Sequence, residues 1–130
     1  MNYLAHFALA GPETGLLVGG FLGDYIKGRL ENRFSAEIER GIRLHRAIDQ
    51  YTDTHPVIRN SYKRFDPRFR RYAGIITDIA FDHLLAKNWR QYYNEPLESY
   101  SANTLEKLLA HEDMLTDAAF QRAAYMQKNN

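Results

Sequence analysis

The spacing of apolar side chains along this chain is helical almost throughout, and this constrains its fold more than any other feature. Within residues 35–53, for example, Ile38 and Ile42 begin a stripe with the repeat of an α-helix. Alternating β-branched residues are nearly absent, and no Asn-Gly or Asp-Gly pair indicates a tight hairpin. We therefore predict an all-α fold. Helices are expected at residues 2–10, 14–27, 35–53, 56–64, 67–90, 96–110 and 115–128.

Residues that favour helix starts support three of these boundaries. Ser35 precedes an acidic first turn and is expected to be an N-cap. Pro56, after His55, and Pro67, after Asp66, are expected at the first position of their helices.

The length of 130 residues suggests one domain, residues 1–130, with a core of its own. The last expected helix has little after it to cap or bury it, so the domain looks short at its C-terminal end. The absence of cysteine excludes a disulfide framework, a zinc ribbon and a thiol nucleophile. Neither a secretory leader nor an apolar run near the ~20 residues of a membrane span is visible. We therefore expect a cytoplasmic protein without a membrane partner.

Glycines recur every four residues at Gly15, Gly19 and Gly23, so they form one stripe of the expected helix 14–27. The segment lacks the GxxxxGK[ST] pattern of a phosphate-binding loop. We interpret the stripe as a surface for close packing of a second helix.

The expected helix 35–53 carries ionisable side chains on its apolar face. His45 and Asp49 continue the stripe that begins at Ile38, and Asp53 extends it. An imidazole and at least one carboxylate are therefore expected to point toward the core.

The expected helix 67–90 has the same property. Ile75, Asp78, Ile79 and Asp82 share one face, and His83 follows Asp82 directly. Burying an unpaired carboxylate costs several kcal/mol, and two that lie close together repel each other. Arginine partners, protonation or a bound cation would each relieve that cost.

Two of these remedies stay open from the residues alone. Arg43 and Arg46 lie near His45 and could form an ion-pair network. The spacings HxxxD and DxxxDH, taken together, favour a metal site instead. Mixed His and carboxylate ligands suit Mn, Fe, Mg or Zn, and the lack of thiolates favours a hard ion such as Mn²⁺ or Mg²⁺. Asp24 and His6 are further candidate ligands.

Several other catalytic classes lack their signatures. No HExxH, no pair of ExxH motifs and no GxSxG occurs, which argues against a zincin, a di-iron bundle and a serine hydrolase. A helical metal-dependent hydrolase is the class that remains.

Basic residues are concentrated in one short segment, residues 59–71, which carries a net charge of +5. The six bases are Arg59, Lys63, Arg64, Arg68, Arg70 and Arg71, and the one acid is Asp66. A local excess of one sign indicates a partner of the other sign, although a solvated helix face is the plain alternative. The whole chain has a net charge of only +1, which argues against a nucleic-acid partner.

Four motifs in order resemble one known family. They are Met-Asn-Tyr-Leu-Ala-His at 1–6, Gly-Asp-Tyr-Ile-Lys-Gly at 23–28, His-Arg-Ala-Ile-Asp-Gln-Tyr-Thr-Asp-Thr-His-Pro at 45–56 and Asp-Ile-Ala-Phe-Asp-His-Leu-Leu-Ala-Lys-Asn-Trp at 78–89. They are similar to the acyl carrier protein phosphodiesterases, over about residues 1–93. The resemblance implies a divergent all-helical HD phosphohydrolase, and members of the family are usually longer at the C-terminus. It further implies a divalent metal, typically Mn²⁺, with Mg²⁺ or Fe²⁺ as alternatives. The implied reaction removes 4′-phosphopantetheine from a serine of acyl carrier protein.

The resemblance also implies roles for individual residues. The residues expected near the metal centre are Asp24, His45, Asp49, Asp78, Asp82 and His83, with His6 close by as a further candidate ligand. Asp49, Asp53 or Asp82 is expected to orient or activate water. His45 or His83 is the expected acid if it is not a ligand.

Basic residues complete the expected site. Lys27, Arg43 and Arg46 are expected to hold the phosphate, and Arg64 and Arg68 to dock the acidic carrier protein. Two alternatives remain at this stage: an HD-type hydrolase of a nucleotide, and a helical module that binds an acidic protein without catalysis.

Overall fold

The computed structural model describes residues 1–129, and in this part of the chain all regular structure is helical, as predicted. The α-helices are α1 (Tyr3–Ala10), α2 (Thr14–Leu22), α3 (Ala36–Thr54), α4 (Pro56–Lys63), α5 (Ala73–Lys87), α6 (Leu97–Ala110) and α7 (Asp117–Lys128). Short 3₁₀ turns are η1 (Arg70–Tyr72), η2 (Trp89–Gln91) and η3 (Glu112–Met114). None of the helices in this described part is both long and apolar enough to cross a membrane.

The helix starts follow from local hydrogen bonds. The Ser35 hydroxyl accepts a bond of 3.4 Å from the amide of Ile38 and caps α3, as predicted. His55 ends α3 and caps α4, because its Nδ1 accepts a bond of 3.2 Å from the amide of Val57. Pro56 occupies the first turn of α4, where its missing N–H is not needed.

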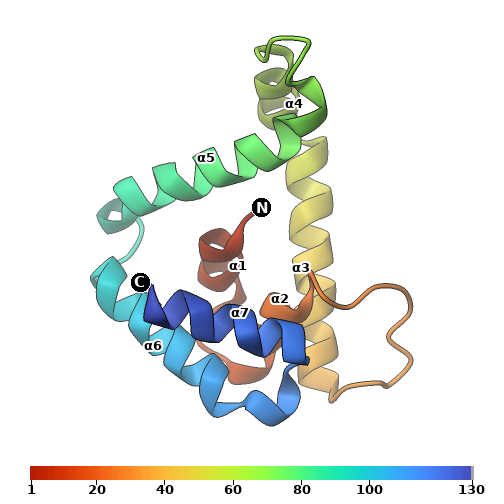
Figure 1. Cartoon of the computed structure of the whole chain (residues 1–130), viewed down its shortest axis with the longest axis vertical. Coiled ribbons are helices and arrows are strands. Elements are labelled where there is room, and N and C mark those ends of the chain that lie inside the picture. The colour runs from red at the N-terminus through yellow and green to blue at the C-terminus, as the bar shows by residue number, and fades with distance from the viewer. Residues whose placement is uncertain (130) are drawn as a thin grey trace.

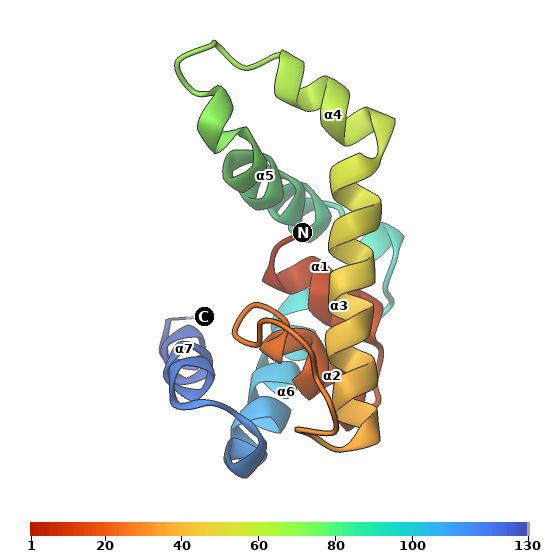
Figure 2. The ribbon, with the colours of Figure 1, turned by 90° about the vertical axis from the view of Figure 1, so that its right-hand side faces the viewer.

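The body of the molecule consists of α1, α2, α6, α7 and the first half of α3 (Figures 1 and 2). Its core is apolar and drawn from all five helices, with Val18, Phe21, Leu22, Ile42 and Leu108 almost completely buried. α3 runs along one side of this body and extends beyond it, so its second half carries α4 away from the core (Figure 1).

The glycine stripe forms the closest helix crossing. A Cβ atom built on Gly41 of α3 would lie 2.8 Å from the Cα of Gly19, and one on Gly19 would collide with the carbonyl of Ile38. Backbone therefore meets backbone where α2 crosses α3, and the interpretation of the stripe as a packing surface is confirmed.

The expected helix 14–27 is too long by five residues, because α2 ends at Leu22. The chain then follows an irregular loop in which Gly28, Glu31 and Asn32 have positive φ angles. Tertiary contacts replace helical ones here, since Ile26 is buried and its carbonyl accepts a bond of 3.0 Å from Arg46.

The expected helix 67–90 is divided, and its start is wrong. Asp66 does not cap a helix; its carboxylate accepts bonds from the amide and Nε of Arg68, which closes a turn. The α-helical part, α5, runs only from Ala73 to Lys87.

α5 and α4 form an arm that stands away from the body (Figure 1). α5 packs mainly on α1, α4 and η1. Ile75 and Ile79 are 65% and 57% exposed, so the expectation that their face points wholly into the core is wrong. Only the acidic part of that face, Asp78 and Asp82, is turned toward the N-terminal segment and α1.

Candidate metal centre

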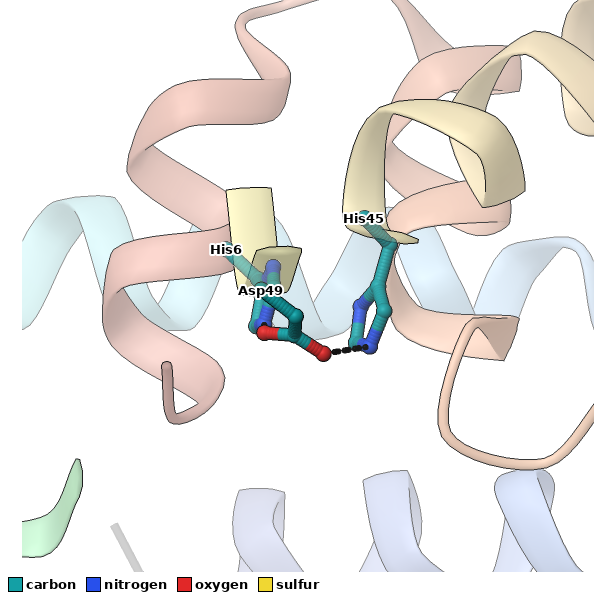
Figure 3. A group of neighbouring side chains, drawn as sticks. All are labelled: His6, His45 and Asp49. Atoms are coloured by element: carbon teal, nitrogen blue, oxygen red, sulfur yellow. Dashed lines mark hydrogen bonds and ion pairs between the residues drawn. The ribbon is translucent and has the colours of Figure 1, made fainter. Parts of the chain in front are cut away.

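Three side chains from two helices converge where the arm joins the body. His6 comes from α1, and His45 and Asp49 come from α3 (Figure 3). One donor atom from each lies within 4.8 Å of the others. His45 and Asp49 are one turn apart, so the helical repeat alone points them the same way.

Asp49 links the two histidines. Its Oδ1 accepts a bond of 3.1 Å from Nε2 of His6, and its Oδ2 lies 3.2 Å from Nε2 of His45. The imidazoles stack with centroids 3.8 Å apart and an interplanar angle of 12°. Both rings are 3% exposed, so the cluster combines two buried bases with one shared carboxylate.

A backbone carbonyl fixes the orientation of His45. Its Nδ1 lies 2.8 Å from the carbonyl oxygen of Gly20, which can only accept, so Nδ1 must carry a hydrogen. Nε2 is thereby directed at the carboxylates of Asp49 and Asp24, at 3.2 and 3.4 Å. Histidines that bind a metal through one ring nitrogen commonly donate a hydrogen bond from the other ring nitrogen to a carbonyl, as His45 does here.

Gly23 leaves the space that His45 fills. A Cβ atom on Gly23 would overlap the imidazole ring. The third glycine of the stripe therefore accommodates a ligand side chain, whereas Gly19 accommodates backbone.

Without a bound cation, a proton on His45 must balance the negative charge of the neighbouring carboxylates. Burial by itself would lower the pKa of His45, but the carboxylates of Asp24 and Asp49 outweigh it and raise the pKa to about 9. Burial would likewise raise the pKa of Asp49, but hydrogen bonds from His45, His6 and the N-terminal amine hold it far below the ordinary value. The carboxylates of the cluster therefore stabilise a positive charge placed among them.

The N-terminal ammonium group supplies part of that charge. The Met1 nitrogen lies 3.1 Å from Oδ1 of Asp49 and 3.3 Å from Oδ1 of Asp78. A cation thus already stands between carboxylates from α3 and α5. The carboxylates of Asp49, Asp78 and Asp24, together with the Nε2 of His45, form a set of oxygen and nitrogen donors that fits a divalent ion.

Asp82 is placed differently from Asp78. Its two carboxylate oxygens accept bonds of 2.8 and 3.0 Å from the amides of Leu4 and Ala5, at the free N-terminus of α1. Burial raises its pKa, and these two hydrogen bonds oppose the shift. Asp82 therefore fastens the helix that carries His6.

The remaining acidic and histidine candidates lie at the edge or outside the cluster. Asp24 contacts His45 and its side chain is 50% exposed; the hydrogen bond to His45 lowers the pKa of Asp24. Asp53, in the last turn of α3, and His83, on α5, are exposed and lie outside the cluster.

The basic candidates are also spread out. Arg43 pairs with Glu39 at 3.2 Å, and Arg46 holds the loop after α2 through the Ile26 carbonyl. Lys27 lies exposed on that loop. Arg64 and Arg68 are exposed at the far end of the arm, between α4 and η1.

Sequence reasoning missed the Met1 amine, the Gly20 carbonyl and the central place of His6. The first two are backbone groups, which no residue pattern reveals. His6 lies on a short helix in which its neighbours Ala5 and Phe7 are also buried. The spacing of apolar residues therefore did not predict which side chain of this helix points into the cluster.

Comparisons with known proteins agree on one family. A family model described as acyl carrier protein phosphodiesterase matches residues 1–130. Proteins named acyl carrier protein phosphodiesterase from Photorhabdus laumondii and Yersinia enterocolitica are 42% and 35% identical over 89 and 122 residues. These matches cover 68% and 93% of this chain, and 45% and 63% of the relatives. The chain thus spans about half the length of the curated relatives it matches. No solved structure matches it.

Proposed function

The chain belongs to the acyl carrier protein phosphodiesterase family, and from that membership we propose that it hydrolyses a phosphodiester bond of holo acyl carrier protein. The bond joins 4′-phosphopantetheine to a serine of the carrier, and the products are the apo carrier and free 4′-phosphopantetheine. The observation that carries the proposal is the cluster of His6, His45 and Asp49, which come from two of the four family-like motifs, residues 1–6 and 45–56. The proposal extends to a cytoplasmic reaction of fatty acid metabolism, on an HD-like helical scaffold.

We propose Mn²⁺ as the metal, with Mg²⁺ or Fe²⁺ as alternatives. His6, His45 and Asp49 would hold it, with Asp78 and Asp24 as further oxygen donors at the edge. A bound divalent ion would lower the pKa of a water molecule and polarise a phosphoryl oxygen.

The protein groups have distinct tasks in this reaction. The Gly20 carbonyl keeps Nδ1 of His45 protonated and its Nε2 free for binding. Asp24 lies on the exposed side of the cluster, where its carboxylate can orient the attacking water. The water gives up a proton as its oxygen bonds to phosphorus, the bond from phosphorus to the serine oxygen breaks, and the serine oxygen takes up a proton. Lys27, three residues along the same loop, is suited to neutralise the phosphate.

The basic segment, residues 59–71, is proposed to contact the acidic carrier protein. Its charges lie at the outer end of the arm, and Arg64 and Arg68 are exposed. A surface of this sign would steer an acidic partner and orient it on the arm.

Mass spectrometry of holo acyl carrier protein incubated with the protein and Mn²⁺ tests the reaction directly. The expected result is loss of the mass of the phosphopantetheine arm, suppressed by a chelator and by Asp49→Asn. An unchanged carrier in the presence of fully metal-loaded protein would contradict the proposal. If a nucleotide were then hydrolysed, the other phosphohydrolase class would be favoured; failure to bind metal at all would favour a non-catalytic module.

A further inference from the structure

A cavity of about 510 Å³ opens beside the metal cluster, between the second half of α3, the start of α4 and α5. Its volume lies in the range of small-molecule sites, ~300–1,000 Å³. The reaction proposed above uses none of its lining residues, so the cavity calls for a separate explanation.

The same elements build the cluster and the cavity. The N-terminal segment contributes the Met1 amine to the cluster, and Met1 also lines the cavity. α3 contributes Asp49 to the cluster and, three residues later, Thr52 to the cavity. α5 contributes Phe81 to the cavity, directly beside Asp82. A molecule with its phosphate at the cluster can therefore continue into the cavity.

The cavity wall is mostly apolar. Phe81, Leu84 and Leu85 of α5 face Val57 and Ile58 of α4 across it.

The polar groups of the cavity are few and partly occupied. The Thr52 hydroxyl donates to backbone carbonyls of α3, and the Asn88 amide nitrogen donates to the carbonyl of Leu84. Tyr51 and Tyr92, 68% and 67% exposed, line its outer parts. Such a wall selects a narrow ligand rich in methyl and methylene groups, with polar groups that can reach the rim.

We propose, resting on the proposed function, that this cavity holds the pantetheine arm of the substrate. The arm begins with two methyl groups next to the phosphate and continues through methylene pairs separated by amides. Phe81 and Leu85 would contact the methyl end, and Leu84 the middle of the arm. A nucleotide base, flat and polar at its edges, would leave its hydrogen-bonding groups unpaired against this wall.

The test uses Leu84→Asp, with Leu9→Asp as its matched control. Leu84 and Leu9 are 48% and 54% exposed, both are helical, and Leu9 does not line this cavity. Activities are measured on holo carrier protein and on a small aryl phosphodiester that has no arm. For Leu84→Asp, we expect the loss of kcat/KM on holo carrier to exceed the loss on the small diester by ~10-fold, because a carboxylate replaces an apolar contact with the arm. Leu9→Asp should show no such difference.

A second substrate makes the assignment sharper. Carrier protein loaded with an arm that lacks the two methyl groups should be a poorer substrate for the wild-type protein. Leu85→Ala, at the end of the cavity assigned to those methyl groups, should discriminate less between the two arms. Equal losses of Leu84→Asp on holo carrier and on the small diester would overturn the proposal.

Direct binding separates this proposal from the reaction itself. If the wild-type protein releases no arm from holo carrier, the proposed function fails, and calorimetry with free 4′-phosphopantetheine and Mn²⁺ still tests the cavity. Binding that Leu84→Asp weakens and Leu9→Asp does not would support the cavity assignment. Equal binding by both variants, or tighter binding of a nucleotide, would overturn it.

Discussion

Single atoms decide the geometry of the cluster. The Gly20 carbonyl holds one nitrogen of His45, Asp49 bridges both histidines, and Gly23 keeps the space beside the ring empty. Each of these groups constrains a ligand that another residue supplies. Substitutions at these positions should therefore affect metal binding before they affect the fold.

Replacing Gly23 by alanine tests this at the position with the least room. The added methyl group overlaps the His45 ring, so the ring must turn away from Asp49 and Asp24. We expect the affinity for Mn²⁺, measured by calorimetry, to fall at least ~10-fold, while the far-ultraviolet circular dichroism stays helical. Gly74→Ala is the control, because its new Cβ would meet its nearest neighbour at an ordinary 3.7 Å. Unchanged affinity in Gly23→Ala would remove His45 from the ligand set.

The protonation of His45 predicts a pH dependence of stability for the metal-free protein. The pKa is about 9 in the folded state and 6.5 for the free side chain. The folded state therefore binds this proton more tightly, so the stabilisation is complete below about pH 6.5 and is lost as the pH rises toward 9. Urea unfolding without metal should show a falling free energy across that window.

Two comparisons test whether His45 causes this fall in the free energy of unfolding with pH. His45→Gln, which cannot take up the proton, should lack it. Saturating Mn²⁺ should reverse it, because the metal competes with the proton for Nε2. A flat profile in the wild-type protein would contradict the assignment.

At the scale of helices, Asp82 connects the arm to the body. It extends from α5 and accepts hydrogen bonds from two free amides in the first turn of α1, the helix that carries His6. It thereby acts as a cap supplied from another helix, and it sets the register of α1 against the cluster.

Removal of Asp82 should therefore change stability and metal binding together. Asp82→Ala leaves two amides without acceptors, and we expect a loss of about 1–3 kcal/mol in the free energy of unfolding, with weaker Mn²⁺ binding. Asp82→Asn keeps one oxygen that can accept, and should recover part of both losses. If Asp82→Asn instead lost metal affinity completely at wild-type stability, Asp82 would be a direct ligand of the metal.

The periodic pattern predicted each α-helix among residues 1–129, and residue types predicted the N-cap Ser35 and the place of Pro56 in the first turn of α4. The pattern also predicted that His45 and Asp49 share one face, because all of these depend on local spacing. The end of α2 and the division of residues 67–90 were not predictable in this way. The first depends on burial of Ile26 in a loop, and the second on a turn closed by Asp66.

At the scale of the whole molecule, the two surfaces that the proposed reaction would use lie apart. The cluster lies where α1, α3 and α5 meet, at the base of the arm, and the basic segment lies at the outer end of the arm (Figures 1 and 2). If the proposed function holds, a small phosphodiester would use only the first surface, whereas a carrier protein would contact both. Binding and chemistry should therefore respond to different substitutions.

Charge reversal at the outer end of the arm tests this separation. Arg64→Glu combined with Arg68→Glu should weaken binding of acyl carrier protein ~10-fold at low salt, measured by surface plasmon resonance, and the difference should shrink as salt screens it. The loss in turnover should be much larger on the carrier than on a small phosphodiester. Arg40→Glu combined with Lys128→Glu changes the net charge equally from exposed positions outside the segment, and is the control. If both double variants lost the same affinity, overall charge rather than residues 59–71 would attract the carrier.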